Sequence, residues 1–356
     1  MQKKTRKMVA LVLAGALMSG IFAACAKGNG ATEGSAVSRS MENDGDTASA
    51  EKRSTLVIAT ESEPPTLHPF DHKAVTATYM NLLTFNALMS IDPETLEPVT
   101  DLAESYETVS DTEWVFTLKQ GVTFHDGSTL DAQDVKASME YAKTYPTTKD
   151  YTSFWTDIQV VDDTHVKITT DGPYAMVLND MASIDILPSE LIDEGNDFNE
   201  NPVGTGPYKF VDWTKGASVT LVANEDYWGE APKTKNLVFK IIAEGNTRLT
   251  SLINGECDII SSVDPASADQ IVDNGFELFS EDGMTINYMA FNTETGKCTD
   301  QEVRKAVAQA INVEEMVKSI YGEYATVANS VMPTWMAPYA KDVKQTAYDP
   351  EAAKKT

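Results

Sequence analysis

Apolar and polar residues follow one another along the chain in patterns that predict a mixed α/β protein. Four short apolar runs are typical of strands: 55–60, 114–119, 166–169 and 237–242. Apolar side chains also recur at helical spacing in residues 75–89 and 303–311. The succession of strand, helix and strand over residues 237–260 indicates a lobe with a partly parallel sheet.

Polar residues at set positions predict where helices begin and end. Asp131 can accept hydrogen bonds from first-turn amides, and Asp134 lies near the positive end of the helix dipole. Gly255 is placed to end a helix in the left-handed conformation. The other predicted helix starts are Asn246, Thr299 with Glu302, Asn312 with Glu315, Pro188 and, at the end of the chain, Asp349-Pro350.

The run Asn201–Trp213, NPVGTGPYKFVDW, combines a tight bend with the start of a hairpin. Gly204 and Gly206 bracket the bend, and Pro207 fixes φ and removes a backbone donor before the strand begins. Strands are predicted over 208–213 and 217–224, with a glycine-containing turn between them. A dinucleotide-binding loop is excluded, because a third glycine is missing and Pro207 stands where a helix would start.

Three segments resemble the extracytoplasmic solute-binding proteins of family 5, which deliver peptides to ATP-binding-cassette (ABC) importers. They are the run just described, LKQGVTFHDGSTLDAQDV at 118–135 and NEDYWG at 224–229. The resemblance covers about residue 55 to the last residue. It implies an α/β, periplasmic-binding-protein-like class II two-lobed fold with an extra domain, incomplete in this chain.

The same resemblance implies how the chain divides. Residues 54–85 and 205–292 form a discontinuous lobe I, residues 86–204 form domain II, and residues 293–356 begin lobe III. In the family, the segment that matches residues 348–356 lies well before the C-terminus. We therefore expect the chain to be a fragment that lacks the rest of lobe III.

The first residues indicate export from the cytoplasm. Residues 1–24 join a basic start to an apolar run that is short and rich in small residues, which is typical of a secretory signal. Ile21–Cys25 resembles a lipoprotein processing site, with Cys25 as the lipidated residue and Phe22 where Leu is more usual. Ordinary cleavage near Ala24 is the alternative. Residues 25–53 contain almost no large apolar side chains and are predicted to be a flexible tether.

The formal charge of −26 predicts a strongly acidic surface. An acidic surface repels nucleic acid and anionic lipid, so we expect no nucleic-acid partner and attachment to the membrane through the lipid anchor alone. The predicted location is the extracytoplasmic face of the cell membrane, as a monomer. Cys257 and Cys298 either form a disulfide or remain unpaired, because sequence does not set their distance.

The resemblance places the first-lobe wall of a ligand cleft after the proline-rich loop 61–69. The candidate ligand-binding residues there are Phe70, Asp71, His72, Lys73 and Ala74. A solvated loop is the alternative for the last four. Asn292 is a further candidate near the crossing between lobes, where a hinge or turn role is also expected.

Tyr151, Phe154 and Trp155 form an aromatic cluster in a polar stretch of domain II. They are candidates for the roof of a side-chain pocket, with ordinary packing as the alternative.

Neither a metal site nor a catalytic site is predicted. His68 and His72, with Asp71, suggest a metal, and nickel binders share the fold. Pro69, however, prevents the two histidines from sharing a helical face. The zinc motif HExxH and the nucleophile motif GxSxG are absent, and His125-Asp126 precedes a glycine as in a turn.

The sequence therefore predicts a non-enzymatic lipoprotein without a cofactor. It would capture di- or oligopeptides and deliver them to ABC permease subunits. Three alternatives stay open: a binder of nickel or another small solute with the same fold, a peptide sensor, and a secreted hydrolase.

Overall fold

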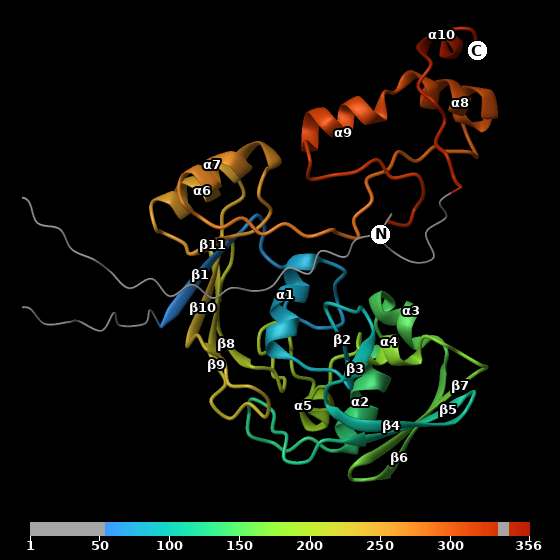
Figure 1. The fold of residues 1–356 in the computed structure, drawn as a ribbon. Coiled ribbons are helices and arrows are strands. Elements are labelled where there is room, and N and C mark those ends of the chain that lie inside the picture. The colour runs from blue at the N-terminus through green and yellow to red at the C-terminus, as the bar shows by residue number, and fades with distance from the viewer. Residues whose placement is uncertain (1–53, 334–341) are drawn as a thin grey trace, which may run out of the picture. The chain divides into compact units, whose positions relative to one another are not determined.

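The computed structural model describes residues 54–333 and 342–356 (Figure 1). The predicted signal segment, Cys25 and the tether lie outside the described residues. Within the described part, no helix has the length and apolar character needed to span a membrane.

One sheet has five strands in the order β11-β1-β10-β9-β8. Their bounds are β1 Thr55–Thr60, β8 Tyr208–Thr214, β9 Ser218–Ala223, β10 Asn236–Ile241 and β11 Ile259–Ile260. β1 runs parallel to both β10 and β11, and the hairpin β8–β9 adds two antiparallel strands. The partly parallel sheet predicted from the pattern is therefore present.

Alternating apolar residues give this sheet its core. Leu237 and Phe239 of β10 are buried with Val219 and Leu221 of β9, because side chains two residues apart point to the same face. The accompanying helices are α1 Val75–Thr84, α6 Gly245–Ile253 and α7 Ala268–Asp273. α1 contacts β8, and α6 contacts β11.

A second sheet has four antiparallel strands in the order β4-β5-β7-β6. Its strands are β4 Ala103–Ser110, β5 Glu113–Leu118, β6 Trp155–Asp162 and β7 His165–Thr170. Helix α2, Ala132–Ala142, lies against β6 and β7 (Figure 1). Asp131 caps it in a reciprocal capping box with Asp134, as the sequence predicts.

Shorter elements complete this part of the chain. The small hairpin pairs β2 Met89–Ile91 with β3 Pro98–Thr100. The short helices are η1 Pro146–Thr148, α3 Lys149–Thr152, α4 Val177–Met181 and α5 Ser189–Glu194. The largest core cluster of the chain is built mainly from these elements together with the four-stranded sheet and α2.

The C-terminal described residues contain short helices and no strand beyond β11. They comprise η2 Pro265–Ser267, η3 Lys297–Thr299, α8 Gln301–Ala310, α9 Val313–Tyr321 and α10 Pro350–Ala353. α8 contacts α10, where the Asp349 amide donates to the Gln309 carbonyl at 2.9 Å. No residue of α8, α9 or α10 is buried in the described structure.

Three predicted helix ends are wrong. α1 ends at Thr84, not Met89, because Ala87 pairs with Asp185 and Met89 enters β2. Glu244 rather than Asn246 precedes α6, and Asp300 rather than Thr299 caps α8 by accepting from the Glu302 amide.

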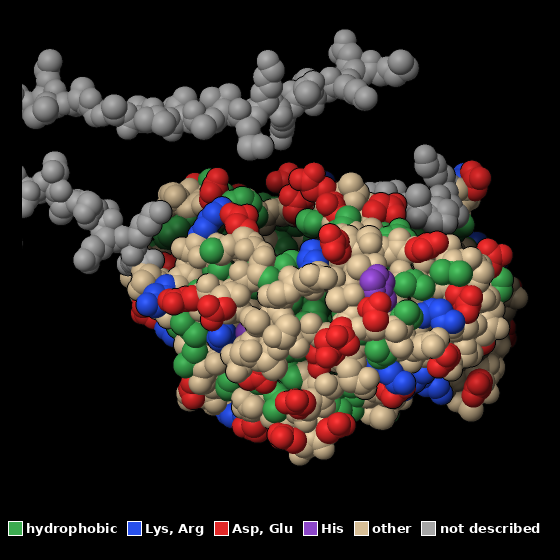
Figure 2. All heavy atoms as spheres, turned by 90° about the horizontal axis from the view of Figure 1, so that it is seen from below, with side chains coloured by type: hydrophobic (Ala, Val, Ile, Leu, Met, Phe, Trp, Pro, Cys, Tyr) green, Lys and Arg blue, Asp and Glu red, His purple; other side chains and the backbone are tan. Residues whose placement is uncertain are grey.

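The described surface carries many acidic side chains, which are spread over the face shown in Figure 2 among fewer basic ones. Cys257 and Cys298 are both free thiols, so the unpaired alternative applies. Cys257 is buried, with its sulfur 3.1 Å from the Ser251 hydroxyl.

Candidate functional site

The parallel strands β1, β10 and β11 end at the same edge of the five-stranded sheet. Polar residues follow each strand there: Glu61 after β1, Glu244 soon after β10, and Ser261 and Ser262 after β11. In open α/β sheets, ligands bind outside the carboxyl ends of the strands. This edge, which we call the sheet-edge site, is therefore the main candidate.

Arg248 holds two loops of the sheet-edge site together. Its side chain is 5% exposed, and it donates to the carbonyls of Ile242 and Ala243, each at 2.7 Å. A third hydrogen bond, of 2.9 Å, reaches the Ser262 carbonyl. The guanidinium is therefore satisfied by backbone groups and fixes the ends of β10 and β11 relative to each other.

Glu61 supplies an ionised carboxylate at the same edge. Burial alone raises the pKa of Glu61, but its own backbone amide, the Ser262 and Ser261 hydroxyls and the nearby Arg248 outweigh that effect. The pKa of Glu61 therefore lies below its usual value. The Ser261 hydroxyl lies 3.2 Å from the carboxylate. Ser262 has φ 53°, a left-handed backbone that non-glycine residues adopt at a cost and that clusters at functional sites.

Sequence reasoning missed Glu61, Ser261, Ser262 and Arg248. The available signal was the polar residue that follows each buried strand, as Glu61 follows TLVIAT and Ser261 follows DII. Arg248 gave no such signal, because its role depends on carbonyls contributed by two other segments.

The predicted cleft-wall residues lie in different environments. Phe70 is 1% exposed, and its side chain packs in the core. Asp71 and Lys73 are exposed, and Lys73 forms an ion pair of 2.9 Å with Asp150. His72 lies 2.9 Å from the Asn81 amide, and Ala74 is the residue before α1. For Phe70 to Ala74, ligand contact stays a prediction.

The three aromatic residues do not form one surface. Phe154 stacks on Tyr174 with ring centroids 4.4 Å apart, and both Tyr151 and Phe154 are partly exposed. Trp155 is 4% exposed and begins β6. Among the described residues no ring contact joins any of the three. Asn292 accepts from the amides of Glu294 and Thr295, which places it in a turn.

His68 is part of an aromatic hydrogen-bond network. Its Nδ1 accepts from the Phe70 amide at 3.1 Å, and its Nε2 lies 2.9 Å from the Tyr145 hydroxyl. Burial lowers the pKa of His68 and keeps it neutral. Both ring nitrogens are therefore occupied. The described residues contain no group of three or more side chains able to hold a metal ion.

The glycines of the run Asn201–Trp213 lie at the junction of the two sheets. The Gly206 amide donates to the Thr84 carbonyl at 2.9 Å, at the end of α1. The Thr205 hydroxyl donates to the Asn86 side chain, whose amide in turn donates to Asp101. The run thus joins segments that are more than a hundred residues apart, and its role in this structure is structural.

His125 completes the junction. Its Nε2 donates to the Gly206 carbonyl at 2.9 Å, and its own amide donates to the Gly204 carbonyl at 2.8 Å. Burial lowers the pKa of His125 to about 4. The Asp126 carboxylate, in contrast, accepts from the Ser128 amide and hydroxyl in a turn.

We expect His125 to stay neutral, with its proton on Nε2, down to pH near 4. A folded pKa below the unfolded value of about 6.5 means that this group's contribution to stability is present at neutral pH and is lost as pH falls below about 6.5. Long-range ¹H–¹⁵N NMR of the imidazole across pH 4–8 would measure the tautomer and the titration midpoint of His125. A midpoint near 6.5 would contradict this assignment.

The family comparison agrees with the fold. The model of bacterial extracellular solute-binding proteins, family 5, matches residues 97–356, and the chain belongs to this family. Proteins of the family are solute-binding components of transporters rather than enzymes, which agrees with the absence of a predicted catalytic site.

Individual relatives are named for different ligands. The glutathione-binding protein GsiB of Salmonella paratyphi A is 30% identical over 309 residues, covering 84% of this chain and 60% of that protein. The dipeptide-binding protein of Escherichia coli K12 is 27% identical over 338 residues, covering 86% and 63%.

A solved structure shows the same fold. NikZ from Campylobacter jejuni in complex with Ni(L-His) matches with a TM-score of 0.77 and 30% identity, over 85% of this chain and 62% of that one. The present chain thus spans roughly three fifths of the length of these relatives.

Proposed function

We propose that this chain is the solute-binding component of an ABC importer, which captures di- or oligopeptides and passes them to permease subunits in the membrane. The observation that carries the proposal is the sheet-edge site, where Arg248 fixes the strand ends and Glu61 is ionised. Family membership and the dipeptide- and glutathione-binding relatives support it.

In this proposal, the sheet-edge site and the segment Asp71–Ala74 form the first-lobe wall of the cleft. A peptide would be held by main-chain hydrogen bonds, with its ammonium group near Glu61. Capture would follow from closure of two lobes on the ligand, which requires tighter binding in the closed state. Lobe I is proposed to be residues 54–85 and 205–292, domain II residues 86–204, and residues 293–356 the start of lobe III.

The proposal also includes export and anchoring. Residues 1–24 would act as a signal and Cys25 would carry lipid, so that a monomer stays at the extracytoplasmic face of the cell membrane through its tether. Labelling cells with a radioactive fatty acid tests the anchor, since a Cys25→Ala chain should lose the label that the unmodified chain carries.

A second candidate ligand is a nickel–histidine chelate, which is favoured by the 30% identity to NikZ. A chelate brings most of its own donor atoms, so it does not require a cluster of metal ligands in the protein. Calorimetry of the full chain with Gly-Leu, tri-alanine and Ni(L-His) separates the candidates. Heat from the chelate with none from either peptide would reverse the ranking, and hydrolysed peptides would indicate an enzyme.

Glu61→Gln is expected to weaken Gly-Leu binding about tenfold or more, because a hydrogen bond to a charged group contributes about 1.5–3 kcal/mol. The measurement is the same calorimetric titration. Glu225→Gln is the matched control, since Glu225 is exposed and follows β9, which ends beside the start of β10 and so at the opposite edge of the sheet. Equal affinities for the two variants would exclude Glu61 from the site.

A further inference from the structure

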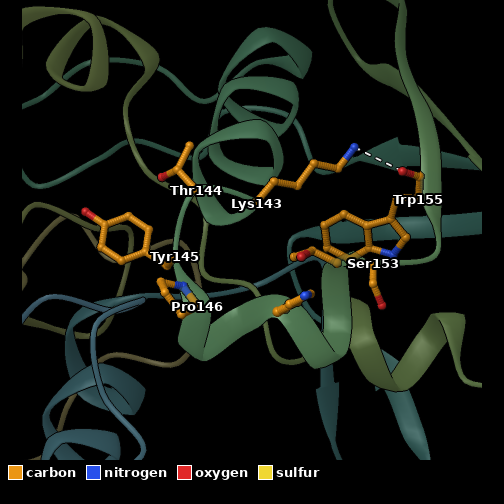
Figure 3. A pocket seen from close by; sticks show the side chains of 8 residues that line it. Lys143, Thr144, Tyr145, Pro146, Ser153 and Trp155 are labelled. Carbon is orange, nitrogen blue, oxygen red and sulfur yellow. Dashed lines mark hydrogen bonds between the residues drawn. The ribbon is translucent and has the colours of Figure 1, made fainter.

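A pocket of about 540 Å³ lies beside the four-stranded sheet (Figure 3). Its walls come from the end of α2, the turn η1, the short helix α3 and the start of β6, all within residues 143–155. Its volume falls within the range of about 300–1,000 Å³ that is usual for small-molecule sites. No residue of the sheet-edge site lines it.

The charged side chains that line the pocket are both cations, Lys143 and Lys149. The Lys143 ammonium donates to the Trp155 carbonyl at 3.1 Å, which leaves its charge unneutralised (Figure 3). In the described part of the chain, Lys149 has no ion-pair partner. Two lysines without carboxylate partners are notable in a chain with 54 acidic and 28 basic residues.

Two acidic side chains near the pocket in sequence pair with other lysines. Asp150 pairs with Lys73 at 2.9 Å, and Glu140 lies 3.8 Å from Lys136. The pocket is therefore locally positive although the whole chain is strongly acidic. Such a concave site attracts and retains anions.

An aromatic wall and several hydroxyls accompany the two lysines. Trp155 lines the pocket, and its indole Nε1 is a buried donor without an acceptor in the described structure. Tyr145 and Pro146 add apolar surface, and Thr144 and Ser153 contribute hydroxyl groups to the lining (Figure 3). The lining therefore combines apolar surface with a few polar groups, as small-molecule sites do.

We propose that this pocket binds a small aromatic carboxylate, at a site separate from the peptide site. The carboxylate would accept hydrogen bonds from the two ammonium groups, and the ring would pack among Trp155, Tyr145 and Pro146. A peptide zwitterion is disfavoured, because its ammonium group would meet two lysines and no carboxylate. The site does not depend on the proposed transport function.

Fluorine NMR of the full chain with 4-fluorobenzoate tests the proposal, with 4-fluorobenzamide as the uncharged probe. We expect saturable broadening of the carboxylate signal and none of the amide signal, with affinity that falls as salt rises. Addition of Gly-Leu should leave the carboxylate affinity unchanged, which separates this site from the peptide site.

Lys143→Gln with Lys149→Gln is expected to weaken carboxylate binding at least tenfold. Both lysine side chains are exposed, so the double variant should fold. The Lys149→Gln single variant serves as a second test, because the Lys149 side chain forms no hydrogen bond in the described structure. Lys233→Gln with Lys305→Gln removes the same charge at two exposed ion pairs elsewhere. Equal affinity in the two double variants, or equal binding of the amide, would overturn the proposal.

Discussion

Gly206→Ala is expected to lower the free energy of unfolding by about 3–5 kcal/mol, or to prevent folding altogether. A Cβ at this position would lie 2.5 Å from both the Leu83 carbonyl oxygen and the Thr84 carbonyl carbon. Both are backbone atoms at the end of α1, so they cannot rotate away as a flexible side chain could. The junction between the sheets would have to separate.

Urea denaturation followed by circular dichroism measures the Gly206 effect. Gly172→Ala is the matched control, because a Cβ there meets no atom within 4 Å and the backbone is not left-handed. We expect the control to change stability by less than about 0.5 kcal/mol. A Gly206→Ala protein as stable as the control would show that the close approach to α1 is not required.

Asp185→Asn is expected to stabilise the protein at pH 8 by about 2–4 kcal/mol and to have little effect near pH 4. Burial raises the pKa of Asp185 to about 7, and the nearby carboxylate of Asp101 adds to the shift. The same variant would therefore have a flatter dependence of stability on pH.

The direction of this pH dependence follows from the proton that Asp185 retains in the folded state. An unfolded aspartate loses its proton near pH 4, whereas folded Asp185 keeps it to about pH 7. The contribution of Asp185 to the free energy of unfolding is therefore fully present below about pH 4 and is lost as pH rises towards 7. Asparagine resembles the protonated carboxyl group and carries no charge at any pH.

Thermal unfolding between pH 4.5 and 8.5 measures the difference between the variant and the unmodified chain. The effect of His125 is the same in both proteins, so it cancels from this difference. Asp193→Asn is the control, because Asp193 is exposed at the end of α5. Parallel pH profiles for Asp185→Asn and the unmodified chain would contradict the assignment.

Local features of the fold were predictable from the sequence. The hairpin of β8 and β9 follows from two apolar runs around a glycine turn, and the capping of α2 by Asp131 depends on residues three positions apart. In both cases the interacting groups are neighbours in the chain. Gly255 likewise occupies a left-handed position just after α6.

Features that depend on distant partners were not predictable. The early end of α1 follows from pairing of Ala87 with Asp185, about a hundred residues further along the chain. The burial of Phe70 and Trp155 depends on the core around α2, and the role of Arg248 depends on carbonyls from two other loops. The role of Arg248 could therefore not be read from the sequence pattern, although the strand ends beside it could.

The contact between Gly206 and Thr84 also has a consequence for how such a protein can evolve. Every strand of the five-stranded sheet lies outside residues 86–204, and every strand of the four-stranded sheet lies inside them. The two ends of that segment adjoin, because the Gly206 amide donates to the Thr84 carbonyl at 2.9 Å and the Thr205 hydroxyl donates to the Asn86 side chain at 3.1 Å. Exchange of residues 86–204 for another segment would therefore leave in place every strand of the five-stranded sheet, together with Glu61 after β1 and Arg248 on α6.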